Sequence, residues 1–388
     1  MRLLPFDYAI RNLARSPKRL ALVIGGSALA SLLVLGAVGF GRGMQRSFSA
    51  TGLASNALVL GSGSEESIER SEISPTTSTV LAANIDGLLV VAGRPAVSAE
   101  IHVALPAATL ETPADAPRSP AMVRGFEPEA FLVHPQVRLT GGRWPARGAD
   151  EVAASPGALA RITGGGGLDL GDRIAIGGRE FTICGLFSAP GTTMHGELWM
   201  RLDRLSQLTQ RTTHSCVIAA LGAAEFDDID AFTSTRLDLE TIAMRESDYY
   251  DRLVAFLAPV RTLVLVTAVL VAVGGILGGV NAMYAAFSSR VREVGTLQAL
   301  GFTRAAIALS LLIESTVACL AGALIACAVG MLLLDGLSVG YTMGSFGIAV
   351  DSTAVLSALV SGLFLGVIGA LPAIARCLSL TIPSALRG

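Results

Sequence analysis

Few residues of this sequence have the types and the spacing that catalysis requires. Neither Gly-x-Ser-x-Gly nor His-Glu-x-x-His occurs, so no nucleophile and base are placed together by a known motif. The histidines lie in unlike surroundings, at His102, His134, His195 and His214. We therefore predict no catalytic residue, no metal site and no cofactor bound by this chain.

The cysteines leave two alternatives open. Cys184 and Cys216 lie in a region of ordinary globular composition, whereas Cys319, Cys327 and Cys377 lie in or after apolar runs. In an oxidising compartment the first two are able to form a disulfide. Because Cys184 lies on an apolar strand pattern, two buried free thiols are the favoured alternative.

One carboxylate lies inside an apolar run. Glu314 would be about 14 Å along a helix that begins at Ala305, at about 1.5 Å per residue. A carboxylate at that depth in a bilayer costs at least about 2.5 kcal/mol. We expect Glu314 to face protein, either paired or protonated, in a structural or signalling contact. Proton coupling is the less favoured alternative.

The composition indicates a membrane protein. Hydrophobic residues make up 52% of the 388 and charged residues 15%, whereas soluble domains carry about 25% charged residues. The net charge of −2 offers no basic excess for binding nucleic acid. Four apolar runs are long enough to cross a bilayer, at residues 20–42, 259–289, 304–334 and 352–375.

The first two runs are separated by residues 43–258, which have globular composition. The predicted fold is an α-helical membrane protein with four transmembrane helices and an α+β extracytoplasmic domain inserted between helices 1 and 2. Short β-rich runs occur at residues 57–60, 97–103, 122–126, 173–176, 181–186, 198–200, 216–221 and 239–244. Helical patterns occur at 79–88, 155–162, 203–210, 224–235 and 247–257, and we expect the last to continue into the second span.

Arginine and lysine set the orientation. They gather in residues 1–19, 290–303 and 376–388, and they are absent from the loop 335–351. The positive-inside rule therefore places both termini and the connector 290–303 in the cytoplasm. Residues 1–19 fit an amphipathic helix on the inner membrane surface or a merely charged flank. A cleaved signal peptide is disfavoured because the apolar run that follows is too long.

The connector between the second and third spans has the most informative pattern. An apolar ridge at threes and fours predicts a short amphipathic helix, and its members are Val291, Val294, Leu297, Leu300 and Ile307. Arg290, Arg292, Glu293 and Gln298 fall on other faces. Gly301 is a candidate C-cap for this helix, and Thr303 is a candidate N-cap for the next.

This connector resembles the FtsX-like permease module of MacB-type (type VII) ABC transporters. That family shows R-x-R-E-I-G-x-L-R-A-L-G at this place, where this chain has RVREVGTLQALG at residues 290–301, followed by Glu314 and Ser315. Val294 for Ile and Gln298 for Arg are mild departures. Residues 142–143, 150–152, 159–160, 170–172, 176 and 181–185 are similar to the MacB-type periplasmic core, and residues 383–387 are similar to the family's C-terminal tail.

The resemblance implies a coupling helix that contacts a cytoplasmic ABC ATPase. Its residues would be Arg290, Arg292, Glu293, Val294, Gly295, Leu297, Gln298, Leu300 and Gly301. The ATPase has to be a separate chain, because no Gly-x-x-x-x-Gly-Lys-Ser/Thr pattern is present to hold phosphates. ATP and Mg would bind to that partner, and this chain is not an enzyme.

Small residues in the second span predict a homodimer. Gly274, Gly275, Gly278 and Gly279 form two overlapping small-xxx-small pairs, which allow close helix packing. The resemblance implies a permease of the cell (inner) membrane that exports or extracts a lipid, lipoprotein, hydrophobic peptide or drug by mechanotransmission. It is compatible with a periplasmic adaptor or membrane-fusion protein as a further partner. The alternative is a non-transporting, FtsX-like regulator of a cell-wall hydrolase.

Overall fold

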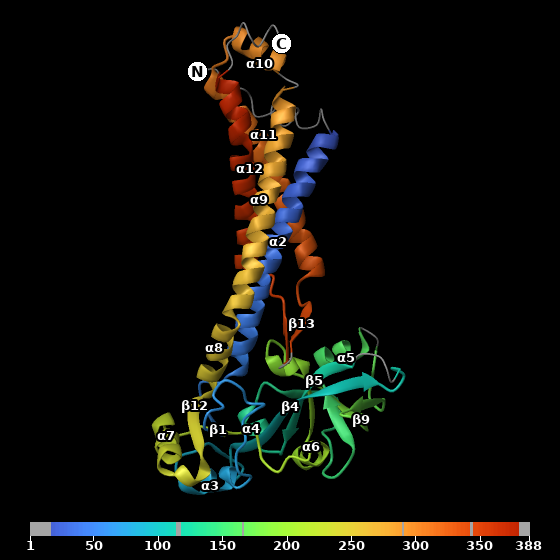
Figure 1. Cartoon of the computed structure of the whole chain (residues 1–388), viewed down its shortest axis with the longest axis vertical. Coiled ribbons are helices and arrows are strands. Elements are labelled where there is room, and N and C mark those ends of the chain that lie inside the picture. Colours follow the sequence, from blue (N-terminus) through green and yellow to red (C-terminus); the bar gives the residue numbers. More distant parts are fainter. Residues whose placement is uncertain (1–16, 114–117, 165–166, 289–290, 342–343, 380–388) are drawn as a thin grey trace. The chain divides into compact units, whose positions relative to one another are not determined.

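The computed structural model describes residues 17–113, 118–164, 167–288, 291–341 and 344–379. They form two units (Figure 1). The helical unit holds the described residues up to Arg42, from Ala258 to Leu337, and from Ile348 onward; the sheet unit holds Gly43–Leu257 and Ser338–Gly347. The helix expected within residues 1–19 falls almost wholly outside the described residues, as do Arg290 and the tail from residue 380.

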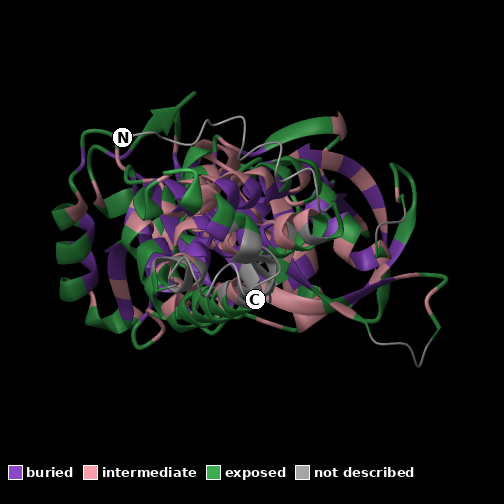
Figure 2. Cartoon of the chain, turned by 90° about the horizontal axis from the view of Figure 1, so that it is seen from above, coloured by how far each residue is buried: buried purple, intermediate pink, exposed green. Residues whose placement is uncertain are grey.

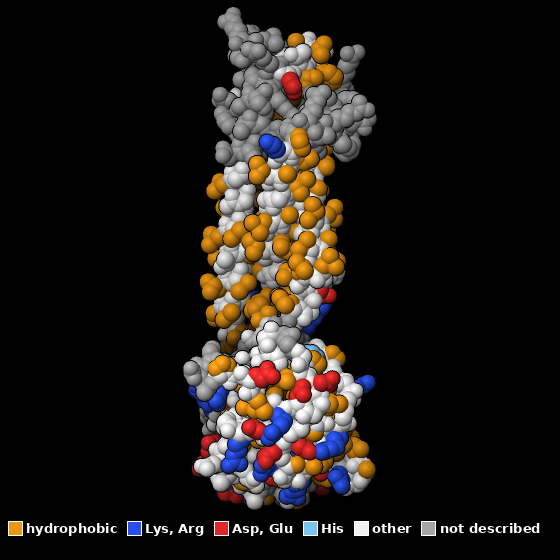
Figure 3. Space-filling view, turned by 90° about the vertical axis from the view of Figure 1, so that its right-hand side faces the viewer, with side chains coloured by type: hydrophobic (Ala, Val, Ile, Leu, Met, Phe, Trp, Pro, Cys, Tyr) orange, Lys and Arg blue, Asp and Glu red, His pale blue; other side chains and the backbone are white. Residues whose placement is uncertain are grey.

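Long apolar helices build the helical unit. They are α2 (Pro17–Thr51, which continues into the sheet unit), α9 (Ala258–Ser288), α11 (Arg304–Leu333) and α12 (Ser352–Ser379), and the shorter α10 spans Val291–Ala299. Each of the four long helices covers all or nearly all of one predicted run, and by length and composition each helix is able to cross a bilayer. Hydrophobic side chains cover these helices, whereas charged side chains gather on the sheet unit (Figure 3).

Small residues bring these helices into close contact. A methyl group added at Gly322 of α11 would lie 2.5 Å from the carbonyl oxygen of Ile24 in α2, and one at Gly362 of α12 would lie 3.2 Å from that of Cys319. The Ser27 hydroxyl of α2 donates to the same Cys319 carbonyl at 2.7 Å. Close backbone packing and interhelical hydrogen bonds are the interactions that hold helices together in lipid.

The sheet unit contains one large sheet. Its strand order is β12-β1-β11-β4-β5-β10-β7-β9-β6, and β8 pairs with both β4 and β9. Their bounds are β1 Asn56–Gly61, β4 Val97–Thr109, β5 Ser119–Phe126, β6 Arg138–Gly142, β7 Glu151–Ala154, β8 Arg173–Ile176, β9 Arg179–Ser188, β10 Glu197–Arg201, β11 Cys216–Ala220 and β12 Thr241–Arg245. The pairs β5–β10 and β7–β9 are parallel, and the others are antiparallel.

Short helices and hairpins complete this unit. The helices are α3 Thr77–Asn84, α4 Ala130–Val133, α5 Pro156–Thr163, α6 Leu202–Thr209, α7 Phe226–Thr235 and α8 Glu246–Phe256, with 3-10 turns η1 Thr193–Gly196 and η2 Leu237–Leu239. The hairpins are β2 Val90–Val91 with β3 Arg94–Pro95, and β13 Ser338–Tyr341 with β14 Gly344–Gly347. The central strands and the inner helix faces are largely buried, whereas β2, β6, the outer helix faces and many loops are exposed (Figure 2).

The helix expected to run from residue 247 into the second span is interrupted. α8 ends at Phe256 and α9 begins at Ala258, with Leu257 in a turn between them. Pro259 explains the break, because it has no N–H to donate and its ring clashes with the carbonyl four residues earlier, that of Ala255. The boundary between the two units falls at the same place.

The loop 335–351 contains a hairpin that we did not predict. β13 and β14 pair antiparallel, and the hairpin belongs to the sheet unit. A methyl group added at Gly340 would lie 2.8 Å from Nε of Arg161 at the end of α5. This loop is therefore a third connection between the two units, beside α2 and α8–α9.

We predict that Gly142→Ala destabilises the chain by about 2 kcal/mol more than Gly178→Ala. Both glycines have positive φ, +70° and +85°, and an alanine there costs about 1 kcal/mol in either case. A methyl group at Gly142 would also lie 2.3 Å from the carbonyl oxygen of Cys184, whereas nothing lies within 4 Å at Gly178. Thermal unfolding of the full chain in detergent measures the difference. Equal losses would contradict the proposed clash.

Candidate functional site

The connector between the second and third apolar helices forms the predicted short helix, α10. Gly301 has φ +92° and accordingly ends α10 in a left-handed conformation. The Thr303 hydroxyl accepts a hydrogen bond from the Ala306 amide and caps α11. Glu293, Thr296 and Leu300 are exposed, and their spacing places them along one stripe of the helix.

Two residues of this segment differ sharply in exposure. Leu300, on the apolar ridge, is 64% exposed, whereas Gln298, on another face, is 8% exposed. Neither amide atom of Gln298 has a hydrogen-bond partner among the described residues. Gly295 is buried and Leu297 is half-buried. The side chains of Arg292 and Val294 lie outside what the structure describes.

The polar and small residues predicted within the spans are placed as follows. Glu314 is 3% exposed and faces the interior of the helical unit beside the buried Ser315. A methyl group added at Gly275 would lie 3.5 Å from Cβ of Ala30 in α2, whereas one added at Gly274 or Gly278 would have no atom of another element within 4 Å. Gly275 is thus packed within this chain. The surroundings of Gly279 are not among those described.

A buried charged cluster in the sheet unit was missed by the sequence analysis. Its centre is Glu100 on β4, whose carboxylate accepts four hydrogen bonds. On Oε1 the donors are Ser98 Oγ at 2.9 Å and His134 Nε2 at 2.9 Å. On Oε2 they are Arg124 at 2.6 Å and His102 Nε2 at 2.9 Å. An ionised carboxylate only accepts hydrogen bonds, so both Nε2 atoms carry a proton.

Arg124 on β5 joins this centre to β10. Its guanidinium forms a bidentate pair with Glu197 at 2.7 and 2.8 Å, and it lies over the Trp199 ring at 5.2 Å. The Trp199 indole N–H in turn donates to Glu197 at 2.8 Å. Register places these groups together, because Arg124 is the cross-strand partner of both His102 and Trp199.

The electrostatics of the cluster follow from burial and pairing. Burial alone would raise the pKa of Glu100 and Glu197. At Glu100, the charges of His134 and Arg124 and hydrogen bonds from the histidines hold the pKa well below the ordinary value. At Glu197, the charge of Arg124 and its hydrogen bonds hold the pKa below the ordinary value. For Arg124, burial is outweighed by the two carboxylates, which keep its pKa well above the ordinary value. Burial and the Arg124 charge lower the pKa of His102. The carboxylates and the guanidinium are thus charged at neutral pH.

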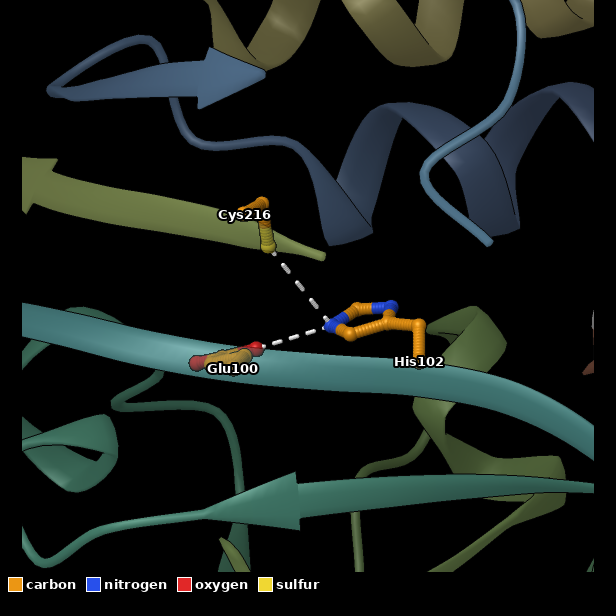
Figure 4. Close-up of side chains that lie close together, drawn as sticks. All are labelled: Glu100, His102 and Cys216. Carbon is orange, nitrogen blue, oxygen red and sulfur yellow. Dashed lines mark hydrogen bonds and ion pairs between the residues drawn. The ribbon is translucent and has the colours of Figure 1, made fainter. Parts of the chain in front are cut away.

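Glu100, His102 and Cys216 lie close enough to suggest a metal site (Figure 4). Their ligand atoms all lie within 4.8 Å of one another, and all three residues are buried. The chemistry does not fit a cation. The carboxylate of Glu100 already has four donors, one of them the cationic Arg124, and burial holds the pKa of the Cys216 thiol well above its ordinary value. Cys184 and Cys216 are both free thiols.

A pocket of about 330 Å³, counted with the part open to solvent, borders the cluster. Its wall includes Glu69, His102, Arg124, Glu197 and Tyr249. Ligand pockets are mostly apolar, with a few polar groups that remain available to the ligand. Here most of the charged groups already bind one another, so we assign the cluster a structural role.

The fold and the coupling segment together define a membrane protein with an extracytoplasmic domain. A profile described as the MacB-like periplasmic core domain matches residues 20–234, and one described as the FtsX-like permease C-terminal matches residues 265–382. The chain belongs to the family of MacB-type, FtsX-like permeases, as its connector motif indicated. Proteins of this family are membrane components of ABC systems.

Two solved structures resemble the sheet unit more distantly. The periplasmic region of MacB from Actinobacillus actinomycetemcomitans is 10% identical, covers 53% of this chain and 94% of its own, and has a TM-score of 0.40. The extracellular domain of the noncanonic ABC-type transporter YknZ from Gram-positive bacteria is 14% identical, covers 49% of this chain and 99% of its own, and has a TM-score of 0.37. No curated protein matches the sequence. The family assignment rests on the two profiles.

Arg124→Met is predicted to destabilise the chain by about 3–5 kcal/mol, because it leaves Glu100 and Glu197 buried without their cation. The control is Arg173→Met. Arg173 pairs with Glu180 on the surface, where the two side chains are 59% and 49% exposed, and its loss should change stability by less than about 0.5 kcal/mol. Denaturant unfolding of both variants tests this. Similar effects would contradict the role of the cluster.

Proposed function

We propose that this chain is the permease subunit of an ABC transporter. A separate cytoplasmic ATPase would hydrolyse ATP with Mg, and the permease would couple that hydrolysis to movement of its extracytoplasmic domain. Both termini and α10 would lie in the cytoplasm. The domain between α2 and α9 would lie outside the inner membrane, because the basic residues flank the spans on the other side.

The exposed stripe of α10 is the observation that carries this proposal. Glu293, Thr296 and Leu300 form a mixed polar and apolar surface on a short helix between two spans. An exposed leucine on the same stripe as a carboxylate fits a partner surface that buries the leucine at its centre and pairs with the carboxylate at its polar rim. Permeases of this family work with an ABC ATPase, which is the partner we assign to this surface.

The spans favour a substrate that is handled at the outer surface rather than carried through a polar channel. Among the described residues of the candidate spans, Glu314 is a carboxylate in the middle of a helix, and it is buried. Arg42 and Arg46 lie toward the end of α2. Arg261 lies at the start of α9. We therefore infer that the transporter exports or extracts a lipid, lipoprotein, hydrophobic peptide or drug. A periplasmic adaptor is compatible with this arrangement.

Regulation of a cell-wall hydrolase is the competing function for this architecture. The match of residues 20–234 to the MacB-like core domain supports transport. Purification in mild detergent separates the two, since the transporter should bring an ATPase with or without an adaptor, and the regulator an ATPase with a hydrolase.

We predict that Leu300→Asp weakens binding of the ATPase at least about tenfold, because a charge would replace the apolar side chain that the partner covers. Leu300 is a cleaner probe than Gly295 or Leu297, whose burial ties them to packing within this chain. The measurement is the amount of ATPase retained on the tagged permease, together with its rate of hydrolysis. Leu237→Asp, at a leucine 78% exposed in the sheet unit, is the control. Unchanged retention with Leu300→Asp would refute the proposed interface.

A second copy of this chain is the partner we propose for α9. Gly274 and Gly278 lie on one face of the helix, and a methyl group added at either would have no atom of another element within 4 Å. Val269, Leu270 and Val273 are exposed nearby. Glycines at this spacing allow the backbones of two helices to approach closely.

A cysteine at Gly278 is predicted to form an intermolecular disulfide in native membranes under mild oxidation, which non-reducing electrophoresis detects. Gly275→Cys is the matched control, since that position packs against Ala30 of the same chain. Crosslinking at Gly275 but not at Gly278 would place the dimer interface elsewhere.

A further inference from the structure

The end of α2 and the start of α8 meet in the sheet unit without room for a side chain between them. A methyl group added at Gly52 would lie 2.7 Å from the Tyr250 ring, 2.8 Å from the carbonyl oxygen of Glu246 and 3.0 Å from Cα of Ser247. Two of these neighbours are backbone atoms, which cannot rotate away. The Phe48 and Tyr250 rings lie 6.1 Å apart on the same contact.

Glu246 ties this contact to the sheet. Its Oε2 accepts the Leu53 backbone N–H at 3.0 Å and the Asn56 side-chain amide at 2.8 Å, and the same amide donates to the Val133 carbonyl at 2.9 Å. The residue is 1% exposed. One carboxylate of α8 therefore holds the chain that follows α2, and through Asn56 it holds β1 and α4.

Further bonds fix each helix end separately. The Thr193 amide donates to the Thr51 hydroxyl at 2.8 Å, which anchors the end of α2 to η1. The Ile68 amide donates to the Tyr249 hydroxyl at 3.1 Å, which anchors α8 to the loop after β1. These bonds hold each helix to the domain. Glu246 instead joins α8 by hydrogen bonds to the chain that follows α2, beside the ring contact of Phe48 with Tyr250.

The helix that begins with α8 is broken a short distance beyond this contact. α8 ends at Phe256, Leu257 forms a turn, and Pro259 deprives the turn of one helical hydrogen bond. α2 has no such break between Pro17 and Thr51. Two helical connections link the units. α2 is continuous, whereas α8–α9 is broken at Leu257, a short distance beyond the contact of α8 with the end of α2; we call this contact, formed by Gly52, Glu246 and Tyr250, the joint.

We propose that Glu246 is a positioning residue for transmission, which makes the end of α2 and the helix α8 move with the sheet as one rigid arm while the bend occurs at Leu257. This rests on the proposed function, because a rigid arm matters only if the spans move the domain. Glu246 lies in the sheet unit, whereas the proposed ATPase surface on α10 lies in the helical unit. Its role is to keep displacement of the spans from being lost where the two helices meet the domain.

Spin labels on the wild-type chain test the arm directly. One pair, at Ser49 and Asp251, lies across the contact between α2 and α8. The other, at Asp248 and Leu265, lies across Leu257; all four residues are exposed, and Leu265 lies on the face of α9 opposite Gly274. The native cysteines are replaced, and the permease is measured in nanodiscs with its co-purifying ATPase, with and without ATP and vanadate. The joint pair should keep its distance, and the pair across Leu257 should change. A nucleotide-dependent change in the joint pair would overturn the proposal.

Two substitutions then test Glu246 itself. Glu246→Gln keeps an oxygen that accepts both hydrogen bonds, so it should retain a narrow distance distribution and full stimulation of ATP hydrolysis. Glu246→Leu removes the acceptor, so it should broaden the distribution of the joint pair and lower the stimulation about fivefold or more. Asp248→Leu, at an exposed carboxylate on the same helix, is the control and should behave as wild type.

The outcomes separate this inference from the proposed function. If Glu246→Leu keeps a narrow distribution and full stimulation while Leu300→Asp uncouples the ATPase, Glu246 has no positioning role and the permease assignment stands. If nucleotide changes neither labelled pair and Leu300→Asp has no effect, coupling itself is refuted.

Discussion

Arg124 is a cation buried at 1% exposure inside a sheet, and this places strict demands on its surroundings. An ion removed from water is tolerated only where charges and hydrogen bonds replace the lost hydration. Glu100 and Glu197 supply the charges from β4 and β10, the strands on either side of β5. A shift of either strand by one residue would turn its carboxylate to the other face. The cluster therefore specifies the register of the three central strands.

The same cluster lies close to the base of the helices that leave the sheet unit. Tyr249 and Tyr250 of α8 line the pocket beside Arg124, and His134, which donates to Glu100, directly follows Val133, whose carbonyl accepts the Asn56 amide. The joint at Glu246 is thus built on the most strongly bonded part of the sheet. A joint that transmits displacement needs such a base, because a soft support would absorb the movement.

The sequence allowed prediction of elements whose patterns are local. The strand at residues 173–176 follows from short-range alternation, and the structure has it as predicted. The long apolar runs correspond to four helices that are long and apolar enough to cross a membrane. Strands without such a pattern were missed, such as β6, which reads RLTGG and is mostly exposed, and the glycine-rich β13–β14 hairpin. Their strand structure comes from pairing with neighbours rather than from intrinsic propensity.

The charged cluster was missed for a related reason. Its members are distant in sequence, and register alone brings them together. One signal was available, since Arg124 stands inside an otherwise apolar strand pattern, where a charge requires a buried partner. Glu100 gave no such signal, because it alternates with Ser98 and His102 in a pattern that also fits a solvated face. On α10, periodicity correctly predicted the helix. Periodicity groups residues on a face and does not tell which face the rest of the protein covers, so it did not predict that Gln298 would be buried while Leu300 is exposed.

The helical and sheet units therefore use opposite means of achieving rigidity. In the helical unit, small residues such as Gly322 and Gly362 let the backbone of a neighbouring helix approach closely. Such close packing holds the helices together, because lipid provides no hydrophobic force between them. In the sheet unit, buried ion pairs and a large apolar core do this. Between two rigid bodies, displacement is taken up where regular structure is weakest. Of the two helical connections, α2 is continuous and α8–α9 is broken at Leu257, which is why the proposed rigid arm has its bend at that turn.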